Sequence, residues 1–260
     1  MVCALRRRKH LPTAPHRPFM MNTASHSKPP LVAVFDVNET LSDMTGLAGR
    51  LEEVGAGAAL LPIWFAATLR DGFALTAAGA YADFSAIAVP TLAAMLAGVE
   101  TLRGTAQTAA EHVVAGMAEL ELHPDVAPGL QQLADAGVRI ITLSNGAASV
   151  AESLLERAGL RHLVEGCLSI SDAGRWKPAP EAYAYAARRC EADLGQLVLI
   201  AVHPWDIDGA RRAGLRTGWL SRDGRAYPSF FLAPEAIGHN LPALAAELID
   251  GGPDAGQPRP

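Results

Sequence analysis

Short apolar runs that alternate with helical stretches constrain the fold of this chain more than any other feature. The strand-like runs are Leu31–Phe35, Val138–Leu143, Cys167–Ile170, Leu197–Val202 and Thr217–Leu220. The helical stretches that separate or follow them are Val126–Ala136, Ala148–Ala158, Pro180–Cys190 and Asp208–Ala213, and three of these end at a glycine, as helices commonly do. Strands that alternate with helices of this length predict parallel β-α-β units, and therefore an α/β fold.

One long segment breaks the alternation. Residues 46–122 show only helical spacing, in the stretches Leu47–Val54, Ala58–Leu69, Phe84–Ala97 and Ala106–Glu119. Because the alternation begins before this segment and resumes after it, we interpret the segment as a helical cap inserted after the first strand. The alternative is that these helices belong to the core of the protein.

This interpretation divides the chain into domains. A core domain takes residues 30–45 and 123–250, and a cap domain takes residues 46–122. Residues 1–29 are expected to form a disordered basic tail and residues 251–260 a flexible C-terminus. We expect the whole segment from Leu241 to Pro260 to fray, because it ends in Gly, Pro and Asp.

The charge distribution argues against nucleic acid as a partner. Residues 1–30 carry six Arg or Lys and no acidic side chain, whereas the other 230 residues carry 16 basic and 27 acidic side chains. Phosphate binding needs a basic face, which this acidic body does not predict. The basic start lacks the apolar stretch of a signal peptide, and no run approaches the ~18 apolar residues of a membrane span. Three scattered cysteines indicate neither a disulfide framework nor a CxxC metal site, so we expect a cytoplasmic protein.

Asp36 follows the first predicted strand directly, at the edge of the sheet where open α/β folds bind ligands. A lone aspartate at this place is equally explained as the cap of the next helix. Three further polar segments, each placed after another predicted strand, favour chemistry over capping. They are Ser144-Asn145-Gly146, Trp176-Lys177-Pro178 and Asp206-Ile207-Asp208.

Each of these segments has a chemical and a structural interpretation. Ser144 and Asn145 offer a hydroxyl, an amide and backbone N–H groups at a helix start, which suits a small anion, although Ser-Asn-Gly is also an ordinary turn. Lys177 is held at a loop-to-helix junction by the proline that follows it, although most lysines are simply solvated. Either Asp206 or Asp208 is expected to cap the last predicted helix.

The four segments, in this order, resemble the motifs of the haloacid dehalogenase (HAD) superfamily of hydrolases. The resemblance covers about residues 31–225, and its details look most like the type II 2-haloacid dehalogenases. The matching details are Asp36 with Thr40, Leu143-Ser144-Asn145-Gly146, Trp176-Lys177-Pro178 with Tyr183, and Trp205-Asp206 with Gly209-Ala210. The resemblance implies a Rossmann-like parallel sheet with a helical cap inserted after the first strand.

The resemblance also implies a reaction and a set of roles. Asp36 would attack the α-carbon of a small 2-haloalkanoic acid and form an ester, from which water releases a 2-hydroxy acid. Lys177 and Thr40 would orient Asp36, and Asp206 would help to activate the water. The residues that the resemblance assigns to substrate binding are Leu41, Ser144, Asn145, Tyr183, His203 and Phe65. It implies a small carboxylate as the only ligand, no metal and no cofactor, and a possible homodimer.

Two residue positions argue against the magnesium phosphatases of the superfamily. Asn38 stands where a phosphatase needs an aspartic acid to protonate its leaving group, and an amide cannot serve as that acid. Ala201-Val202 stands where a phosphatase has Gly-Asp as the first metal-binding carboxylate. Asp36 and Asp206 would still supply two carboxylates, so a magnesium-dependent phosphatase of small metabolites stays open as an alternative.

Other positions depart from the dehalogenase pattern. The family places an arginine early in the cap to contact the halide, but the alignment puts Phe65 there, and Arg70 lies on another helix face. His203 replaces an asparagine, Ala201 replaces a serine, and Asn38-Glu39 replaces Tyr-Gly. These departures keep open a hydrolase of non-halogenated 2-substituted acids. A HAD-like binding module without activity is a separate alternative, which the joint presence of Asp36, Thr40, Ser144, Lys177 and Asp206 disfavours.

Overall fold

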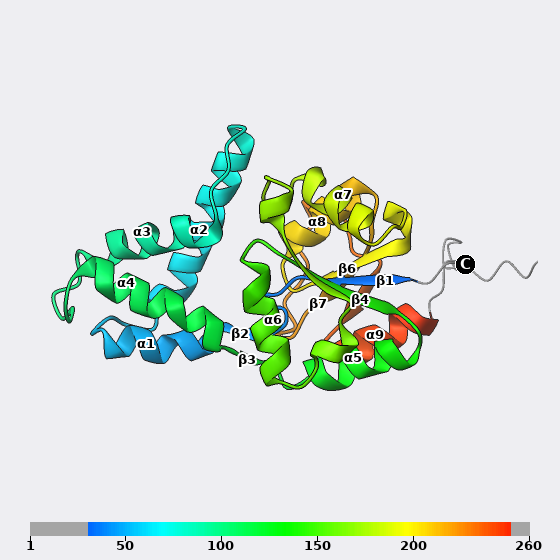
Figure 1. Cartoon of the computed structure of the whole chain (residues 1–260), viewed down its shortest axis with the longest axis horizontal. Coiled ribbons are helices and arrows are strands. Elements are labelled where there is room, and N and C mark those ends of the chain that lie inside the picture. The colour runs from blue at the N-terminus through cyan, green and yellow to red at the C-terminus, as the bar shows by residue number, and fades with distance from the viewer. Residues whose placement is uncertain (1–30, 251–260) are drawn as a thin grey trace, which may run out of the picture.

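The computed structural model describes residues 31–250, and a parallel sheet forms its centre (Figure 1). The strands lie in the order β5-β4-β1-β6-β7-β8, and every neighbouring pair is parallel. Their bounds are β1 Val32–Phe35, β4 Arg139–Ser144, β5 Gly166–Ser169, β6 Leu197–Ala201, β7 Arg216–Leu220 and β8 Ala236–Gly238. The predicted α/β class is confirmed, and each predicted strand is present with β1 at the middle of the sheet.

Helices cover both faces of the sheet (Figure 1). Successive side chains of a strand point to opposite faces, so β1 contributes Ala33 and Phe35 to one hydrophobic cluster and Val32 and Val34 to another. On the first face lie α5 Val126–Asp135, α6 Ala148–Arg157 and α9 Leu241–Asp250; on the second lie α7 Pro180–Arg189 and α8 Pro204–Ala213. The central strand is therefore buried on both sides.

A layer of helices stands apart from the sheet, to the left in Figure 1. These helices are α1 Leu47–Glu53, α2 Leu60–Ala77, α3 Phe84–Leu96 and α4 Ala106–Ala115. Two short antiparallel strands, β2 (Ser42–Asp43) and β3 (Glu121–Leu122), pair where the chain leaves and re-enters the sheet region. We call the segment between them, Met44–Leu120, the helical insertion. It follows β1 in the chain and lies on the side of the sheet where β1 ends.

Helix α8 begins earlier than the sequence predicts. It starts at Pro204, because proline lacks only an N–H that is unpaired in the first turn in any case, and His203 is the N-cap residue. The expectation that Asp206 or Asp208 caps this helix is wrong. Asp206 lies inside the first turn, and the Asp208 carboxylate accepts a hydrogen bond from the backbone N–H of Leu232 instead.

The expectation that the chain frays from Leu241 onward is wrong for residues 241–250. These residues form α9, whose side chains Leu241, Leu244 and Leu248 are buried against the sheet. The apolar residues of this segment recur at helical spacing, so burying them stabilises a helix even though the segment is followed by polar residues and glycines. The predictions for residues 1–29 and 251–260 lie outside the described residues.

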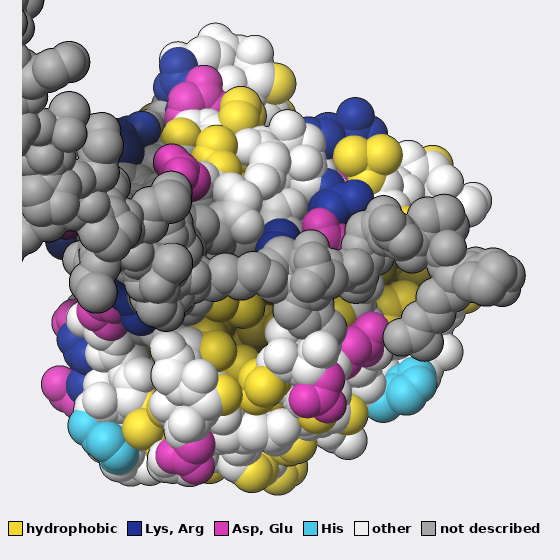
Figure 2. Space-filling model, turned by 90° about the vertical axis from the view of Figure 1, so that its right-hand side faces the viewer, with side chains coloured by type: hydrophobic (Ala, Val, Ile, Leu, Met, Phe, Trp, Pro, Cys, Tyr) yellow, Lys and Arg dark blue, Asp and Glu magenta, His cyan; other side chains and the backbone are white. Residues whose placement is uncertain are grey.

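The surface of the described residues carries mixed charge. Figure 2 shows the face that is turned away from the helical insertion, where acidic and basic side chains are interspersed among hydrophobic ones. Over residues 31–250, every helix is too short or too polar to span a lipid bilayer.

Candidate active site

Asp36 directly follows β1 and is held on both of its carboxylate oxygens. Its backbone N–H donates to the carbonyl of Ile200 at 3.1 Å, which extends the pairing of β1 with β6 by one residue. Oδ1 accepts a hydrogen bond from Lys177 Nζ at 2.8 Å, and Oδ2 accepts one from Thr40 Oγ1 at 2.6 Å. The Asp36 side chain is only 6% exposed. The carboxylate is thus fixed in orientation at the carboxyl edge of the sheet.

Lys177 joins Asp36 to a second buried carboxylate. Its Nζ lies 2.6 Å from Asp206 Oδ2, and the other Asp206 oxygen accepts a hydrogen bond from the Tyr183 hydroxyl at 2.6 Å. The side chains of Lys177 and Asp206 are fully buried. A buried charge is tolerated only when it is paired and hydrogen-bonded, and this network meets that condition.

The network shifts the pKa of each member. Burial raises the pKa of Asp36, but Lys177, His203 and Thr40 together outweigh burial and hold that pKa below its ordinary value. Burial also raises the pKa of Asp206, and there burial with the nearby charge of Asp36 prevails over Lys177. Burial lowers the pKa of Lys177, but the two carboxylates raise it by more. Asp36 is therefore kept ionised, as a carboxylate nucleophile must be.

The segment before Lys177 is tied to the helical insertion. Trp176 is fully buried, its backbone N–H donates to Thr76 Oγ1 at 3.1 Å, and its indole N–H donates to the carbonyl of Ala82 at 2.9 Å. Gly72 of α2 permits this packing, because a Cβ there would lie 2.4 Å from the Trp176 ring. The backbone N–H of Lys177 donates to Asn145 Oδ1 at 3.0 Å. The position of the lysine thus depends on both β4 and the insertion.

Ser144 and Asn145 line one of two cavities beside Asp36. This cavity has a volume of about 660 Å³ and lies between the end of β4 and the insertion. Asn38 and Gly146 also line it, and Ser144 Oγ accepts a hydrogen bond from the Gly146 N–H at 2.9 Å. Both Ser144 and Asn145 are nearly buried, and the predicted anion-binding groups therefore face the inside of a cavity at the end of β4.

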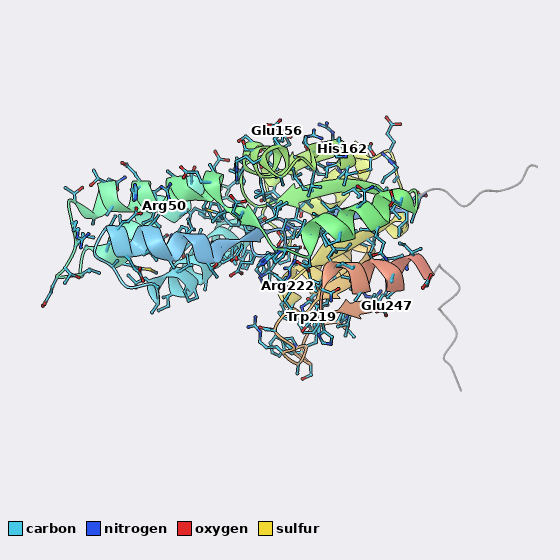
Figure 3. All side chains as sticks on the ribbon, turned by 90° about the horizontal axis from the view of Figure 1, so that it is seen from below. Arg50, Glu156, His162, Trp219, Arg222 and Glu247 are labelled. Atoms are coloured by element: carbon cyan, nitrogen blue, oxygen red, sulfur yellow. The ribbon has the colours of Figure 1, made fainter. Side chains whose placement is uncertain are left out.

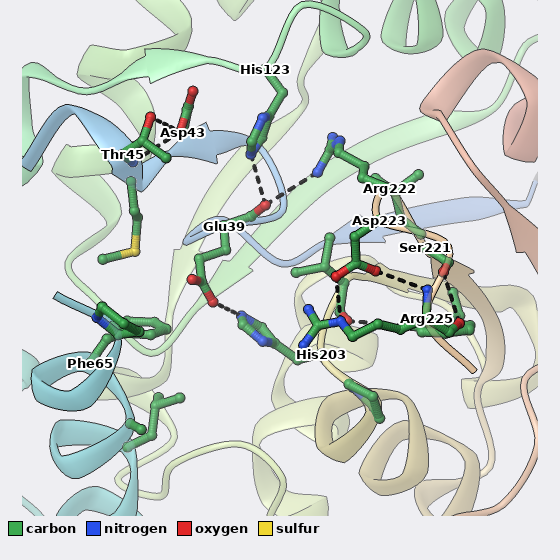
Figure 4. A pocket seen from close by; sticks show the side chains of 18 of the residues that line it. Glu39, Asp43, Thr45, Phe65, His123, His203, Ser221, Arg222, Asp223 and Arg225 are labelled. Atoms are coloured by element: carbon green, nitrogen blue, oxygen red, sulfur yellow. Dashed lines mark hydrogen bonds and ion pairs between the residues drawn. The ribbon is translucent and has the colours of Figure 1, made fainter. Parts of the chain in front are cut away.

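A second cavity, of about 670 Å³, contains Phe65 and His203 in its wall (Figure 4). His203 Nε2 lies 3.1 Å from the carbonyl oxygen of Asn38 and 3.6 Å from Asp36 Oδ2. The Phe65 ring from α2 lies 6.1 Å from the imidazole, centre to centre. The Trp205 ring stacks on the imidazole, with ring centres 5.1 Å apart. His203 thus stands between the cavity and Asp36.

Sequence reasoning did not include Glu39 among the site residues. Its side chain lines the cavity of Figure 4, with Oε2 at 3.7 Å from His203 Nε2. Its backbone has φ of 62°, in the left-handed region that favours glycine. The sequence did indicate an unusual backbone at this position, because Glu39 occupies the place of a glycine in the family motif.

Arg222 and His123 hold the backbone of Glu39 in this conformation. The carbonyl oxygen of Glu39 accepts hydrogen bonds from His123 Nε2 at 3.0 Å and Arg222 Nη1 at 3.2 Å. Arg222 also donates to the Thr40 carbonyl and pairs with Asp125 (3.0 Å), and Figure 3 shows it at the junction of insertion and sheet. Residues this distant in the chain give no sequence signal of their contact.

Not every predicted site residue reaches the two cavities. Asp36, Thr40, Lys177, Asp206 and Tyr183 form one hydrogen-bonded network, in which Tyr183 contacts Asp206 and is itself fully buried. The Leu41 side chain does not come to the site. It is 1% exposed and packs in the hydrophobic cluster that contains Phe35 and Val37, because the turn after β1 directs it to the first face of the sheet.

Comparisons with known proteins identify the family of this chain. A family profile described as haloacid dehalogenase-like hydrolase matches residues 31–214. The chain therefore belongs to the haloacid dehalogenase-like hydrolases. It is 30% identical to (S)-2-haloacid dehalogenase 4A of Burkholderia cepacia over 82% of this chain and 90% of that protein. It is 27% identical to (S)-2-haloacid dehalogenase 1 of Pseudomonas sp. (strain CBS-3), over 82% and 92% respectively.

Solved structures give the same result. The structure of an L-2-haloacid dehalogenase superimposes with a TM-score of 0.76 at 29% identity, over 84% of this chain and 97% of that one. The structure of a dehalogenase with an intermediate complex superimposes with a TM-score of 0.77 at 26% identity, over 85% and 97%. The predicted family is confirmed.

Proposed function

We propose that this hydrolase is a 2-haloacid dehalogenase that converts small 2-haloalkanoic acids to 2-hydroxy acids through an ester on Asp36. The observation that carries the proposal is the pairing of both Asp36 oxygens, with Lys177 and with Thr40, at the carboxyl edge of the sheet. An ionised and oriented carboxylate beside an anion cradle suits nucleophilic attack on an α-carbon. The named relatives support the same substrate class.

In the first step, an Asp36 oxygen forms a bond to the α-carbon, and the carbon–halogen bond breaks with its electron pair on the halide. Ser144 and Asn145 bind the substrate carboxylate from the cavity that they line. Lys177 keeps Asp36 ionised by lowering its pKa against the effect of burial. Attack from the face opposite the halogen inverts the configuration at the α-carbon.

In the second step, water attacks the carbonyl carbon of the Asp36 ester, and the 2-hydroxy acid departs. Asp206 assists as a proton acceptor, and its raised pKa makes it a stronger base than an ordinary aspartate. Tyr183 and Lys177 hold the Asp206 carboxylate in position through hydrogen bonds at 2.6 Å each. Thr40 does the same for Asp36, and its Oγ1 also accepts the backbone N–H of Val202 at 3.2 Å.

The contacts of Asp206 do not favour the alternative of a magnesium phosphatase. Both of its oxygens accept hydrogen bonds, from Lys177 and from Tyr183, and it is fully buried. A divalent cation that bridged Asp36 and Asp206 would have to take the place of the Lys177 ammonium. The donor set therefore fits a reaction in which an ammonium, and no metal, neutralises the two carboxylates.

The helical insertion closes the site in this proposal. It corresponds closely to the predicted cap domain, residues 46–122, and contributes Phe65 to the cavity wall. A homodimer and a cytoplasmic location belong to the same proposal. Sedimentation analysis of the purified protein tests the dimer, and fractionation of the producing cells tests the location.

The deciding experiment measures halide release from (S)-2-chloropropionate in the presence of EDTA. We expect stoichiometric chloride and (R)-lactate without added metal. Turnover in heavy-oxygen water should then place the heavy label in the Asp36 carboxylate, detected by peptide mass spectrometry. Magnesium-dependent phosphate release without halide release, or an Asp36 that keeps light oxygen through many turnovers, would reject the proposal.

A further inference from the structure

The imidazole of His203 has an environment that selects its protonated nitrogen. Around Nε2 lie the carbonyl oxygen of Asn38 at 3.1 Å, Asp36 Oδ2 at 3.6 Å and Glu39 Oε2 at 3.7 Å. All three atoms are hydrogen-bond acceptors, so Nε2 carries a proton and acts as a donor. An N–H donor therefore lies beside the nucleophile.

Charged groups around His203 come from separate parts of the chain. Asp36 faces it from the end of β1 and Glu39 from the next turn. Arg225, in the loop after β7, forms an ion pair with Asp223 and also acts on the charge of Glu39. From α2 the neighbour is the uncharged Phe65 ring, and on its own helix it is the uncharged Trp205. The negative charge near His203 thus comes chiefly from the end of β1 and the turn after it.

Glu39 is fixed toward His203 at an energetic cost. Its φ of 62° is unfavourable for a residue with a side chain, and His123 and Arg222 hold the carbonyl that sets this conformation. An unfavourable backbone conformation next to a nucleophile is typical of a residue whose side chain must point in one direction for function. The side chain that it directs lines the cavity and ends near the imidazole (Figure 4).

We propose that His203, positioned by Glu39, binds the departing halide and so determines which leaving groups this enzyme accepts. The inference rests on the proposed function. As the Asp36 oxygen bonds to carbon, its negative charge disappears and an equal charge forms on the halogen. The Nε2–H then donates its hydrogen bond to the halide in place of the acceptors near Asp36, and no proton has to be transferred. Glu39 acts through His203 and is a positioning residue.

The site favours leaving groups that accept strong hydrogen bonds. Fluoride and chloride are small and hold their charge densely, whereas bromide leaves carbon easily without a donor. The contribution of His203 should therefore grow from bromide to chloride to fluoride. The His203 side chain is only 11% exposed and the Phe65 ring lies beside it, so the donor is largely shielded from bulk water, which strengthens its interaction with an anion.

The test compares leaving groups in matched variants. Single-turnover rates are measured with 2-bromo- and 2-chloropropionate for the wild type, for His203→Asn and for Glu39→Gln. We expect His203→Asn to lose about 10- to 100-fold with the chloro acid and about tenfold less with the bromo acid. Glu39→Gln should change the chloro/bromo ratio in the same direction by a smaller factor.

The chain offers a matched control in a second His–Glu pair. His112 Nε2 lies 2.9 Å from Glu53 Oε2 on the surface of the insertion, and both side chains are about half exposed or more. His112→Asn should leave the chloro/bromo ratio unchanged. Equal losses of His203→Asn on both acids would assign His203 a structural role and overturn the inference, while halide release by the wild type would leave the proposed function standing. Absence of halide release by the wild type from every 2-haloacid would overturn both.

A binding measurement removes the dependence on turnover. Trp205 stacks on the imidazole at 5.1 Å, so an anion at Nε2 lies within collision distance of the indole. Sodium bromide titrated into the wild type should quench part of the tryptophan fluorescence with saturation. The saturable part should be absent in His203→Asn and present in His112→Asn. Saturable quenching that survives in His203→Asn would place the halide elsewhere and overturn the inference.

Discussion

Two parts of the site are built in different ways. The floor consists of Asp36, Lys177 and Asp206, which are nearly or fully buried and joined by contacts of 2.6 to 2.8 Å. The wall consists of Glu39, Phe65 and His203, which line a cavity. The Glu39 carboxylate lies 3.7 Å from His203 Nε2, and the Phe65 and His203 ring centres lie 6.1 Å apart. The charged groups of the floor are held in place by hydrogen bonds, whereas the residues of the wall face a cavity that can accommodate a ligand. In the proposed function the floor carries out the reaction, and we infer that the wall selects the substrate.

The largest effect should follow from the floor. Asp36→Asn removes the nucleophile, and we expect halide release to fall by at least about 10⁴-fold for every 2-haloacid. The measurement is halide release across chloro and bromo acids, with circular dichroism to confirm folding. Asp71→Asn, which alters a surface pair with Arg70, serves as the control and should retain full activity. Residual activity of Asp36→Asn that depends on the halogen would contradict the division between floor and wall.

Lys177→Met should destabilise the protein as well as inactivate it. It leaves Asp36 and Asp206 buried without a cation, which costs about 3–5 kcal/mol in the free energy of unfolding. The double variant Lys177→Met/Asp206→Asn should regain part of that stability but none of the activity. Urea unfolding of the wild type and both variants measures this, and a double variant no more stable than the single one would show that the carboxylates are not the cause.

The single variant Lys177→Met should also reverse the direction in which the ionisation of Asp36 makes the free energy of unfolding depend on pH. In the wild type the pKa of Asp36 lies below its ordinary value of 3.8. Its carboxylate therefore stabilises the fold above pH 3.8, and this contribution is lost as the pH falls through the lower folded pKa. In Lys177→Met, burial would raise that pKa, so stability should fall as the pH rises through it. Unfolding curves at several pH values decide the sign.

Gly72→Ala tests the link between the floor and the insertion. The added Cβ would lie 2.4 Å from the Trp176 ring, so the tryptophan before Lys177 must shift. We expect a loss of about 1–3 kcal/mol in stability and a reduced turnover number. Gly49→Ala in α1 is the matched control, because nothing lies within 4 Å of its added Cβ. That control should gain about 0.5–1 kcal/mol; equal behaviour of the two alanines would disprove the contact.

The smallest effect on stability should come from the wall. Glu39→Gly relieves a positive φ and should stabilise the fold by about 0.5–1 kcal/mol, while it lowers activity on chloro acids more than on bromo acids. Glu191→Gly, at φ of 52°, should stabilise by a similar amount without any loss of activity. Thermal unfolding and the chloro/bromo rate ratio test the pair. An unchanged ratio in Glu39→Gly would mean that its side chain serves no purpose in the wall.

Much of the floor was predictable because its residues sit at one kind of place in the chain. Asp36 directly follows β1, and Asp206 lies in the first turn of the helix that follows β6. The carboxyl ends of such parallel strands meet at one edge of the sheet. The capping prediction for Asp206 failed because the proline at position 204 starts the helix earlier than the apolar spacing suggests. The wrong capping prediction concerned only the local role of Asp206, and its expected place after the strand β6 was correct.

The wall and the residues around it were predicted only in part. Phe65 and His203 were assigned to substrate binding, whereas Glu39 was not. Leu41 was assigned to the substrate because local sequence does not say which face of a tight turn a side chain takes, and packing with Phe35 decides this. Arg222 contacts Asp125 and the carbonyl of Glu39 in the turn after β1. These contacts join residues that are 97 or more positions apart in the chain. Such contacts depend on how the insertion and the last strands are placed together, which no local pattern records.

The sequence by itself determined the order of strands and helices, the place of the helical insertion and the identity of the buried carboxylates and lysine. Periodicity and strand-end position are local properties, so they can be read along the chain. Only the tertiary structure decided that one ammonium serves both carboxylates and that Glu39, His203 and Phe65 meet in one cavity wall. Those arrangements depend on distances between residues far apart in the chain, which packing alone sets.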